Sequence, residues 1–107
     1  MSGFDLEKLA AIIAERARAG GDKSYTSKLL EDGIEKCAKK LGEEAVETVV
    51  AALSADQKSV IAESADLLYH LLVVLEARDI KLADVYAELT RRTAQSGLEE
   101  KASRKNG

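Results

Sequence analysis

Apolar residues recur at helical spacing through most of the chain. In the segment from about Asp5 to Ala19, apolar side chains share one side of a helical wheel and charged side chains occupy the other. The apolar set is Leu6, Leu9, Ile12 and Ile13. This pattern predicts an amphipathic helix that ends at Gly20 and Gly21.

A polar segment, Asp22–Thr26, follows the first helix. Ser24 or Thr26 can cap a short helix that contains Leu29 and breaks at Gly33, because a hydroxyl oxygen accepts a hydrogen bond from a free N–H of the first turn. We interpret this segment as a loop with one helical turn.

Three further long helices follow from the same periodicity. One runs from Ile34 to about Leu53, and a second ends near Arg78 after a short connection in which Ser54 or Asp56 is the cap. So short a connection makes these two helices antiparallel neighbours. The last helix fits Leu82 to about Thr93.

The helix that ends near Arg78 is apolar around nearly its whole circumference. Its apolar residues are Leu67, Leu68, Leu71, Leu72, Val73, Val74 and Leu75. A helix of this kind must be buried, and the short helices of one chain can hardly cover it. We therefore expect a homodimer in which this segment lies at or near the interface, since twofold symmetry is the commonest arrangement.

Composition favours one folded helical domain over residues 1–107. The chain has no proline, and its 46% hydrophobic and 33% charged residues make it too apolar for a disordered chain and too evenly charged for a membrane protein. We predict the all-α class, as an antiparallel bundle of four main helices, with a weakly ordered tail from about residue 95.

Net charge, hydropathy and cysteine content argue against several classes of partner and site. A net charge of -3 opposes nonspecific binding to nucleic acid. No apolar run approaches the roughly 20 residues that cross a bilayer, and no signal pattern begins the chain, so we expect a cytoplasmic protein with no membrane partner. Cys37 is the only cysteine, which excludes an internal disulfide and a cysteine-based zinc site.

Two pairs of acidic residues carry the candidate chemistry. Glu44 and Glu47 lie three positions apart on one helix, and so do Glu63 and Asp66 on the next, with His70 one turn further along the same stripe. Antiparallel packing brings the four carboxylates together, where they repel one another unless a cation neutralises them. Oxygen donors of this kind suit Mg²⁺, or Mn²⁺, better than zinc.

Lysines near these acids leave more than one interpretation of the acidic pairs open. Lys40 falls between Glu44 and Glu47 on the helical wheel, one turn earlier, and can contact phosphate. Each acid taken singly is more typical of a solvated helix face. A scaffold protein whose acids pair with lysines is therefore the competing class of function.

Three segments resemble the phosphoribosyl-ATP pyrophosphatase branch of the MazG-like pyrophosphohydrolases. They are Ser24-Tyr25-Thr26, Lys40-Leu41-Gly42-Glu43-Glu44-Ala45, and Glu63-Ser64-Ala65-Asp66-Leu67-Leu68-Tyr69-His70. The wider group has an E-x-x-E pair followed by E-x-x-D, which Glu44, Glu47, Glu63 and Asp66 match here. The resemblance covers most of the chain.

The resemblance implies a dimeric enzyme that hydrolyses the α–β phosphoanhydride of phosphoribosyl-ATP, the second step of histidine synthesis. The four acids of the motif would hold Mg²⁺, with Glu44 and Glu47 also counted as catalytic. Glu43 would be an outer carboxylate or general base, or else a solvated neighbour of Lys39. The runner-up activity is hydrolysis of a noncanonical or pyrimidine nucleoside triphosphate with the same acids.

The same resemblance places substrate-binding residues around the metal. The set is Ser24, Tyr25, Thr26, Lys40 and His70. Tyr25 could stack on adenine or pack against the first helix, and His70 could bond a carboxylate, bond a phosphate or serve only the fold.

Overall fold

The computed structural model describes residues 3–20, 24–54 and 56–94, and these form α-helices without any strand. The helices are α1 (Leu6–Ala19), α2 (Tyr25–Asp32), α3 (Ile34–Ser54), α4 (Gln57–Ala77) and α5 (Leu82–Thr93). The all-α class is thus confirmed, and each long helix begins and ends within one residue of the predicted bound. The tail expected from about residue 95 lies outside the described residues, as does Gly21.

Side-chain caps explain where α1 and α4 start. A carboxylate oxygen of Asp5 accepts a hydrogen bond from the Lys8 N–H at 2.9 Å at the start of α1, and Asp56 accepts from the Ser59 N–H at the same distance at the start of α4. Asp56 is therefore the cap of α4. The alternative cap, Ser54, is the last residue of α3 instead.

The segment interpreted as a loop with one turn is a longer helix. Ser24 caps α2, with its hydroxyl oxygen accepting from the Ser27 N–H at 3.0 Å, and the Ser27 side chain accepts from the Ser24 N–H at 3.2 Å. This reciprocal capping satisfies free N–H groups and stabilises the eight-residue helix that ends at Gly33, where φ is +100°. The predicted single turn was too short.

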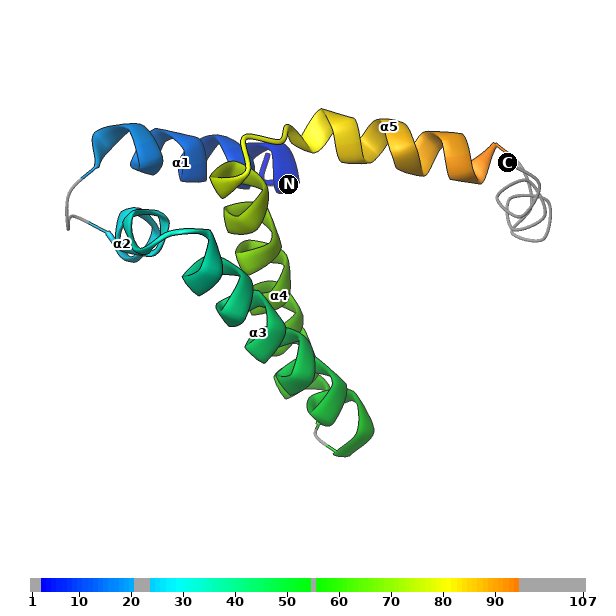
Figure 1. Cartoon of the computed structure of the whole chain (residues 1–107). Coiled ribbons are helices and arrows are strands. Elements are labelled where there is room, and N and C mark those ends of the chain that lie inside the picture. The colour runs from blue at the N-terminus through cyan, green and yellow to red at the C-terminus, as the bar shows by residue number, and fades with distance from the viewer. Residues whose placement is uncertain (1–2, 21–23, 55, 95–107) are drawn as a thin grey trace.

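The antiparallel pair α3 and α4 forms the long arm of the molecule, and α1 and α2 lie at one end of it (Figure 1). The core lies at that end. It consists of Ile13, Leu29, Cys37, Leu72 and Val73, which come from all four of these helices. Cys37 is fully buried, and its thiol donates to the Leu29 carbonyl oxygen at 3.3 Å. This core fixes α2 against the arm.

Helix α5 points away from the arm and contributes no buried residue (Figure 1). Its Tyr86 hydroxyl donates to Glu7 at 3.0 Å, a contact with α1. Within the described chain, the expected antiparallel bundle of four helices is therefore confirmed only for the α3–α4 pair.

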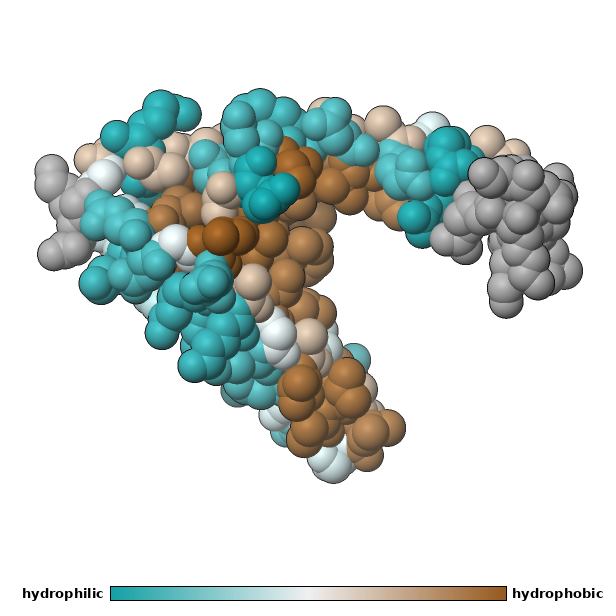
Figure 2. Space-filling model, in the orientation of Figure 1, coloured by the Kyte–Doolittle hydropathy of each residue, from teal (hydrophilic) through white to brown (hydrophobic). Residues whose placement is uncertain are grey.

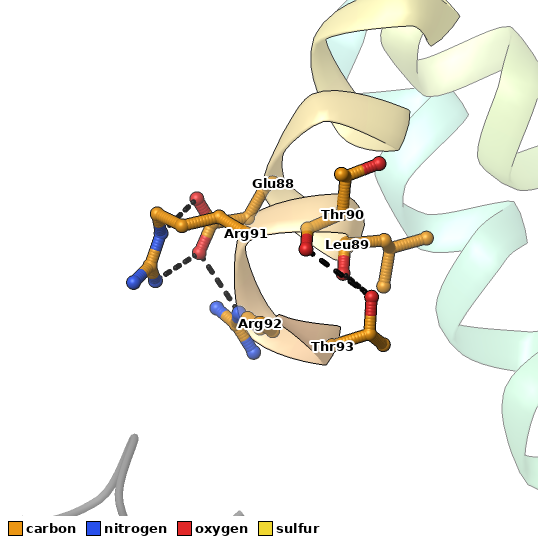
Figure 3. A network of polar contacts seen from close by, with 6 residues as sticks. All are labelled: Glu88, Leu89, Thr90, Arg91, Arg92 and Thr93. Carbon is orange, nitrogen blue, oxygen red and sulfur yellow. Dashed lines mark hydrogen bonds and ion pairs between the residues drawn. The ribbon is translucent and has the colours of Figure 1, made fainter. Parts of the chain in front are cut away.

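Local side-chain contacts stabilise α5 where tertiary packing does not. Glu88 accepts hydrogen bonds from Arg91 and Arg92, at 2.6 Å and 2.8 Å for the closest pairs, and these bonds lower the pKa of Glu88 to about 2 (Figure 3). The Thr93 hydroxyl lies within bonding distance of the Leu89 and Thr90 carbonyls. Pairs at this spacing support an isolated helix.

Among the described helices, none combines the length and the apolar character that crossing a bilayer requires.

Candidate metal centre

Acidic side chains from both helices of the arm converge at its middle. Glu44 of α3 and Glu63 and Asp66 of α4 each place a carboxylate oxygen within 4.8 Å of the others. The i,i+3 spacing puts Glu63 and Asp66 on one face of α4, and antiparallel packing sets that face against the turn of α3 that carries Glu44. Three of the four predicted metal ligands are thus brought together.

Two oxygens of this cluster are buried without a hydrogen-bond partner. They are Glu44 Oε1 and Glu63 Oε1. Burial raises the pKa of Glu63, and the neighbouring charges of Glu47, Glu44 and Asp66 raise it further. Buried carboxylate oxygens without partners are costly, and a divalent cation compensates them. The donor set is oxygen only, which fits Mg²⁺ or Mn²⁺.

Glu47, the fourth predicted ligand, lies beside the cluster rather than in it. Its side chain is exposed, yet its charge is close enough to raise the pKa of Glu63. Glu47 and Glu63 also line the same groove on the surface of the arm.

Thr48 ties the two helices together behind the acids, a role that sequence reasoning missed. Its hydroxyl shares a hydrogen bond between the Glu44 carbonyl oxygen at 2.8 Å and the Glu63 carbonyl oxygen at 3.2 Å. One side chain therefore fixes the relative height of the turns that carry Glu44 and Glu63. A threonine one turn after Glu44 was the only signal in the sequence.

Lys40 and Glu43 form an ion pair at the edge of the cluster. The distance from Lys40 Nζ to Glu43 Oε1 is 3.2 Å, and this hydrogen bond is the main reason that the pKa of Lys40 is raised. The charge of Glu44 also contributes to the raised pKa of Lys40. Glu43 thus pairs with Lys40, whereas the sequence had suggested Lys39.

His70 is buried, and its ring bonds to a backbone carbonyl and to a tyrosine hydroxyl. Its Nδ1–H donates to the Asp66 backbone carbonyl at 2.8 Å, because a carbonyl oxygen can only accept. Nε2 is then left to accept from the Tyr25 hydroxyl, at 3.4 Å. His70 therefore links Tyr25 to the turn of α4 that carries Asp66.

The Ser24-Tyr25-Thr26 segment divides into capping, exposed and buried positions. Ser24 caps α2, and Thr26 is only 1% exposed, with its oxygen 2.5 Å from that of the Tyr69 hydroxyl. Tyr25 is 54% exposed and is the member open to a ligand. Tyr69 had no role assigned from the sequence, although it stands next to His70.

Comparison with known proteins matches this chain to one family. A family model described as phosphoribosyl-ATP pyrophosphohydrolase matches residues 6–93. The phosphoribosyl-ATP pyrophosphatase 1 of Bradyrhizobium diazoefficiens is 62% identical over 105 residues, covering 98% of this chain and 99% of that protein. The phosphoribosyl-ATP pyrophosphatase of Sinorhizobium medicae is 58% identical over 99% of both chains, and that of Agrobacterium fabrum is 59% identical over 97% of both.

Proposed function

This chain belongs to the phosphoribosyl-ATP pyrophosphohydrolase family, and we infer that it hydrolyses phosphoribosyl-ATP to phosphoribosyl-AMP and pyrophosphate in histidine biosynthesis. The observation that carries this conclusion is the match of nearly the whole chain to enzymes of that name. Release of pyrophosphate from phosphoribosyl-ATP tests it, with dUTP and dCTP as comparison substrates. A preference for either pyrimidine triphosphate would overturn the assignment.

We propose Mg²⁺ as the cofactor, with Glu44, Glu63 and Asp66 as ligands and Glu47 completing the set. Support comes from the unpartnered buried oxygens of Glu44 and Glu63 and from the charge of Glu47 beside them. When bound, Mg²⁺ would neutralise charge on the phosphates and lower the pKa of a water. Mn²⁺ prefers similar ligands and should substitute.

The residues of this chain would then position substrate and water for displacement at phosphorus. The water oxygen forms a new bond to one phosphorus of the α–β anhydride, the bridging P–O bond breaks, and pyrophosphate leaves. A proton from the water passes to a carboxylate, for which Glu47 and Glu43 are the candidates. Glu43 is held at the site by Lys40, and Glu47 by its place beside Glu63.

Lys40 is proposed to contact the polyphosphate. Lys40→Met should lower kcat/KM by about 10- to 100-fold, since a charge-assisted hydrogen bond to phosphate is lost. Lys39→Met is the matched control, because Lys39 is exposed and points about 100° away around α3. Steady-state kinetics on both variants measure the difference. Equal, small losses would make Lys40 an ordinary partner of Glu43.

A homodimer is proposed because both helices of the arm expose large apolar side chains. Brown surface covers the far end of the α3–α4 arm (Figure 2). The exposed apolar residues are Val46, Val49, Val50 and Leu53 of α3 and Ile61, Leu68 and Leu71 of α4. A groove of about 340 Å³ runs along this surface and includes Glu47 and Glu63. A second copy seated here would bury the surface and close one side of the metal centre.

Removal of this apolar surface should dissociate the dimer. Leu53 is 83% exposed, so Leu53→Asp leaves packing within the chain intact while placing a charge in the proposed interface. Sedimentation should show a dimer for the unaltered protein and a monomer of reduced helicity for the variant. Phe4→Asp is the control, because Phe4 is an exposed apolar residue that precedes α1 and belongs to neither helix of the arm. A compact, fully helical monomer of the unaltered protein at low concentration would contradict the proposal.

We also propose a cytoplasmic location. The fully buried free thiol of Cys37 suits a reducing compartment, and a biosynthetic step on a nucleotide belongs with its soluble substrate.

A further inference from the structure

Tyr25, Tyr69 and His70 form a cluster of three rings beside the metal centre. The Tyr25 and Tyr69 rings are stacked, with centroids 6.3 Å apart and planes inclined by 23°. The His70 ring meets both tyrosines edge-on, at 80° and 88°. Tyr25 comes from α2, whereas Tyr69 and His70 come from α4, so the cluster joins the two helices.

Hydrogen bonds fix the orientation of Tyr25 in this cluster. Its hydroxyl donates to His70 Nε2, and His70 is itself fixed by the bond from Nδ1 to the Asp66 carbonyl. Tyr69 stacks against Tyr25 and is held by the bond between its hydroxyl and that of the buried Thr26. Tyr25 nevertheless remains 54% exposed. A rigid aromatic ring with an open side is a stacking surface for another flat ring.

The position of Tyr25 relative to the acids indicates which part of a bound nucleotide would lie at its ring. The Tyr25 hydroxyl bonds to His70, and His70 bonds to the backbone carbonyl of Asp66, so the ring is linked through one side chain to the turn that carries a metal-centre acid. Lys40 forms its ion pair with Glu43, the neighbour of Glu44. A nucleotide whose anhydride lies at the acids and whose phosphates contact Lys40 would direct its nucleoside towards Tyr25.

We propose that the open side of the Tyr25 ring stacks on the adenine of the substrate, and that Tyr69 and His70 are positioning residues for it. This inference rests on the proposed function, because the adenine belongs to phosphoribosyl-ATP. It assigns base recognition to α2 and leaves the metal chemistry to the α3–α4 arm. The open face of Tyr25 then sets the affinity for the purine, and Tyr69 sets the angle at which that face is presented.

A fluorescent ring at position 25 tests the stacking directly. The chain has no tryptophan, so Tyr25→Trp introduces a single indole whose emission a stacked adenine quenches. AMP with Mg²⁺ should quench this emission saturably, whereas ribose 5-phosphate with Mg²⁺, which lacks the base, should not. Tyr86→Trp on α5 is the control and should respond to neither compound.

The outcomes separate this inference from the proposed function. Absence of quenching by AMP, or equal quenching in Tyr86→Trp, overturns the stacking role even if the unaltered protein hydrolyses phosphoribosyl-ATP. Failure of the unaltered protein to release pyrophosphate overturns the proposed function itself, whichever way the fluorescence behaves.

Kinetics of two Tyr25 variants provide a second measurement. Tyr25→Leu should raise KM by about 10- to 100-fold with a much smaller change in kcat, since base stacking contributes to binding. Tyr25→Phe keeps the ring and should retain most of the affinity. Equal KM values for the two variants would contradict stacking.

A double substitution tests the positioning role of Tyr69. Tyr69→Phe alone should raise KM by several-fold, because the bond to Thr26 is lost and Tyr25 is less well held. Added to Tyr25→Leu it should have no further effect. An additive increase in KM would show that Tyr69 acts independently of Tyr25 and would remove it from the proposed role.

Discussion

Replacement of Glu63 by glutamine should lower turnover of phosphoribosyl-ATP by about a thousandfold or more, because the cation loses a charged ligand that stabilises developing charge on the phosphates. The same substitution should raise the thermal midpoint of the metal-free protein. Glu63 carries a buried oxygen without a partner and faces three other carboxylates, so its removal relieves both burial of charge and repulsion. Steady-state kinetics and thermal unfolding followed by circular dichroism measure the two effects.

Loss of activity together with a gain in stability distinguishes a ligand from a structural acid. Glu35→Gln is the control, since Glu35 is exposed at the start of the same α3 helix that carries Glu44. Asp66→Asn should behave as Glu63→Gln does. Turnover within a few-fold of the unaltered protein in either ligand variant would place the metal centre elsewhere.

Removal of divalent cations should abolish turnover, and added Mg²⁺ or Mn²⁺ should restore it. The acids without a cation present a concentrated negative charge that repels a polyphosphate, so the loss should approach the full catalytic effect. Treatment with a chelator, followed by titration with each metal, measures both loss and recovery.

Stability should change in step with activity in the same titration. Mg²⁺ should raise the thermal midpoint of the unaltered protein, because a ligand that binds only the folded state stabilises it. Glu63→Gln should show a much smaller rise. Undiminished turnover in excess chelator would rule out metal-dependent chemistry at this centre.

Sequence periodicity predicted the long helices because the relevant signals are local. Caps such as Asp5 and Asp56 act on N–H groups three residues away, and the apolar stripe of α1 is visible without knowledge of its partner. The meeting of Glu44 with Glu63 and Asp66 was also predictable, since a short connection between two helices leaves them antiparallel.

Contacts between distant segments could not be predicted in the same way. The hydrogen bond between Thr26 and Tyr69 joins residues 43 positions apart, and neither residue type indicates which residue it will bond to. The direction of α5 could not be predicted either. Its apolar stripe shows that one face favours burial, but not which surface would bury it. Lys39 and Lys40 lie four and three residues before Glu43, so either could pair with it on a helix. The structure shows that Lys40 forms the ion pair.

The separate origins of the acids and of the Tyr25 ring have a consequence for divergence among related enzymes. The acids belong to the α3–α4 arm, whereas Tyr25 belongs to a helix of eight residues that meets the arm through a few side chains. With the base at Tyr25 and the metal at the acids, as proposed, mutations in this short helix would change which base is accepted without altering the acids. New substrate preferences could therefore arise on the same hydrolytic scaffold through changes near Tyr25, with the acids of the arm retained.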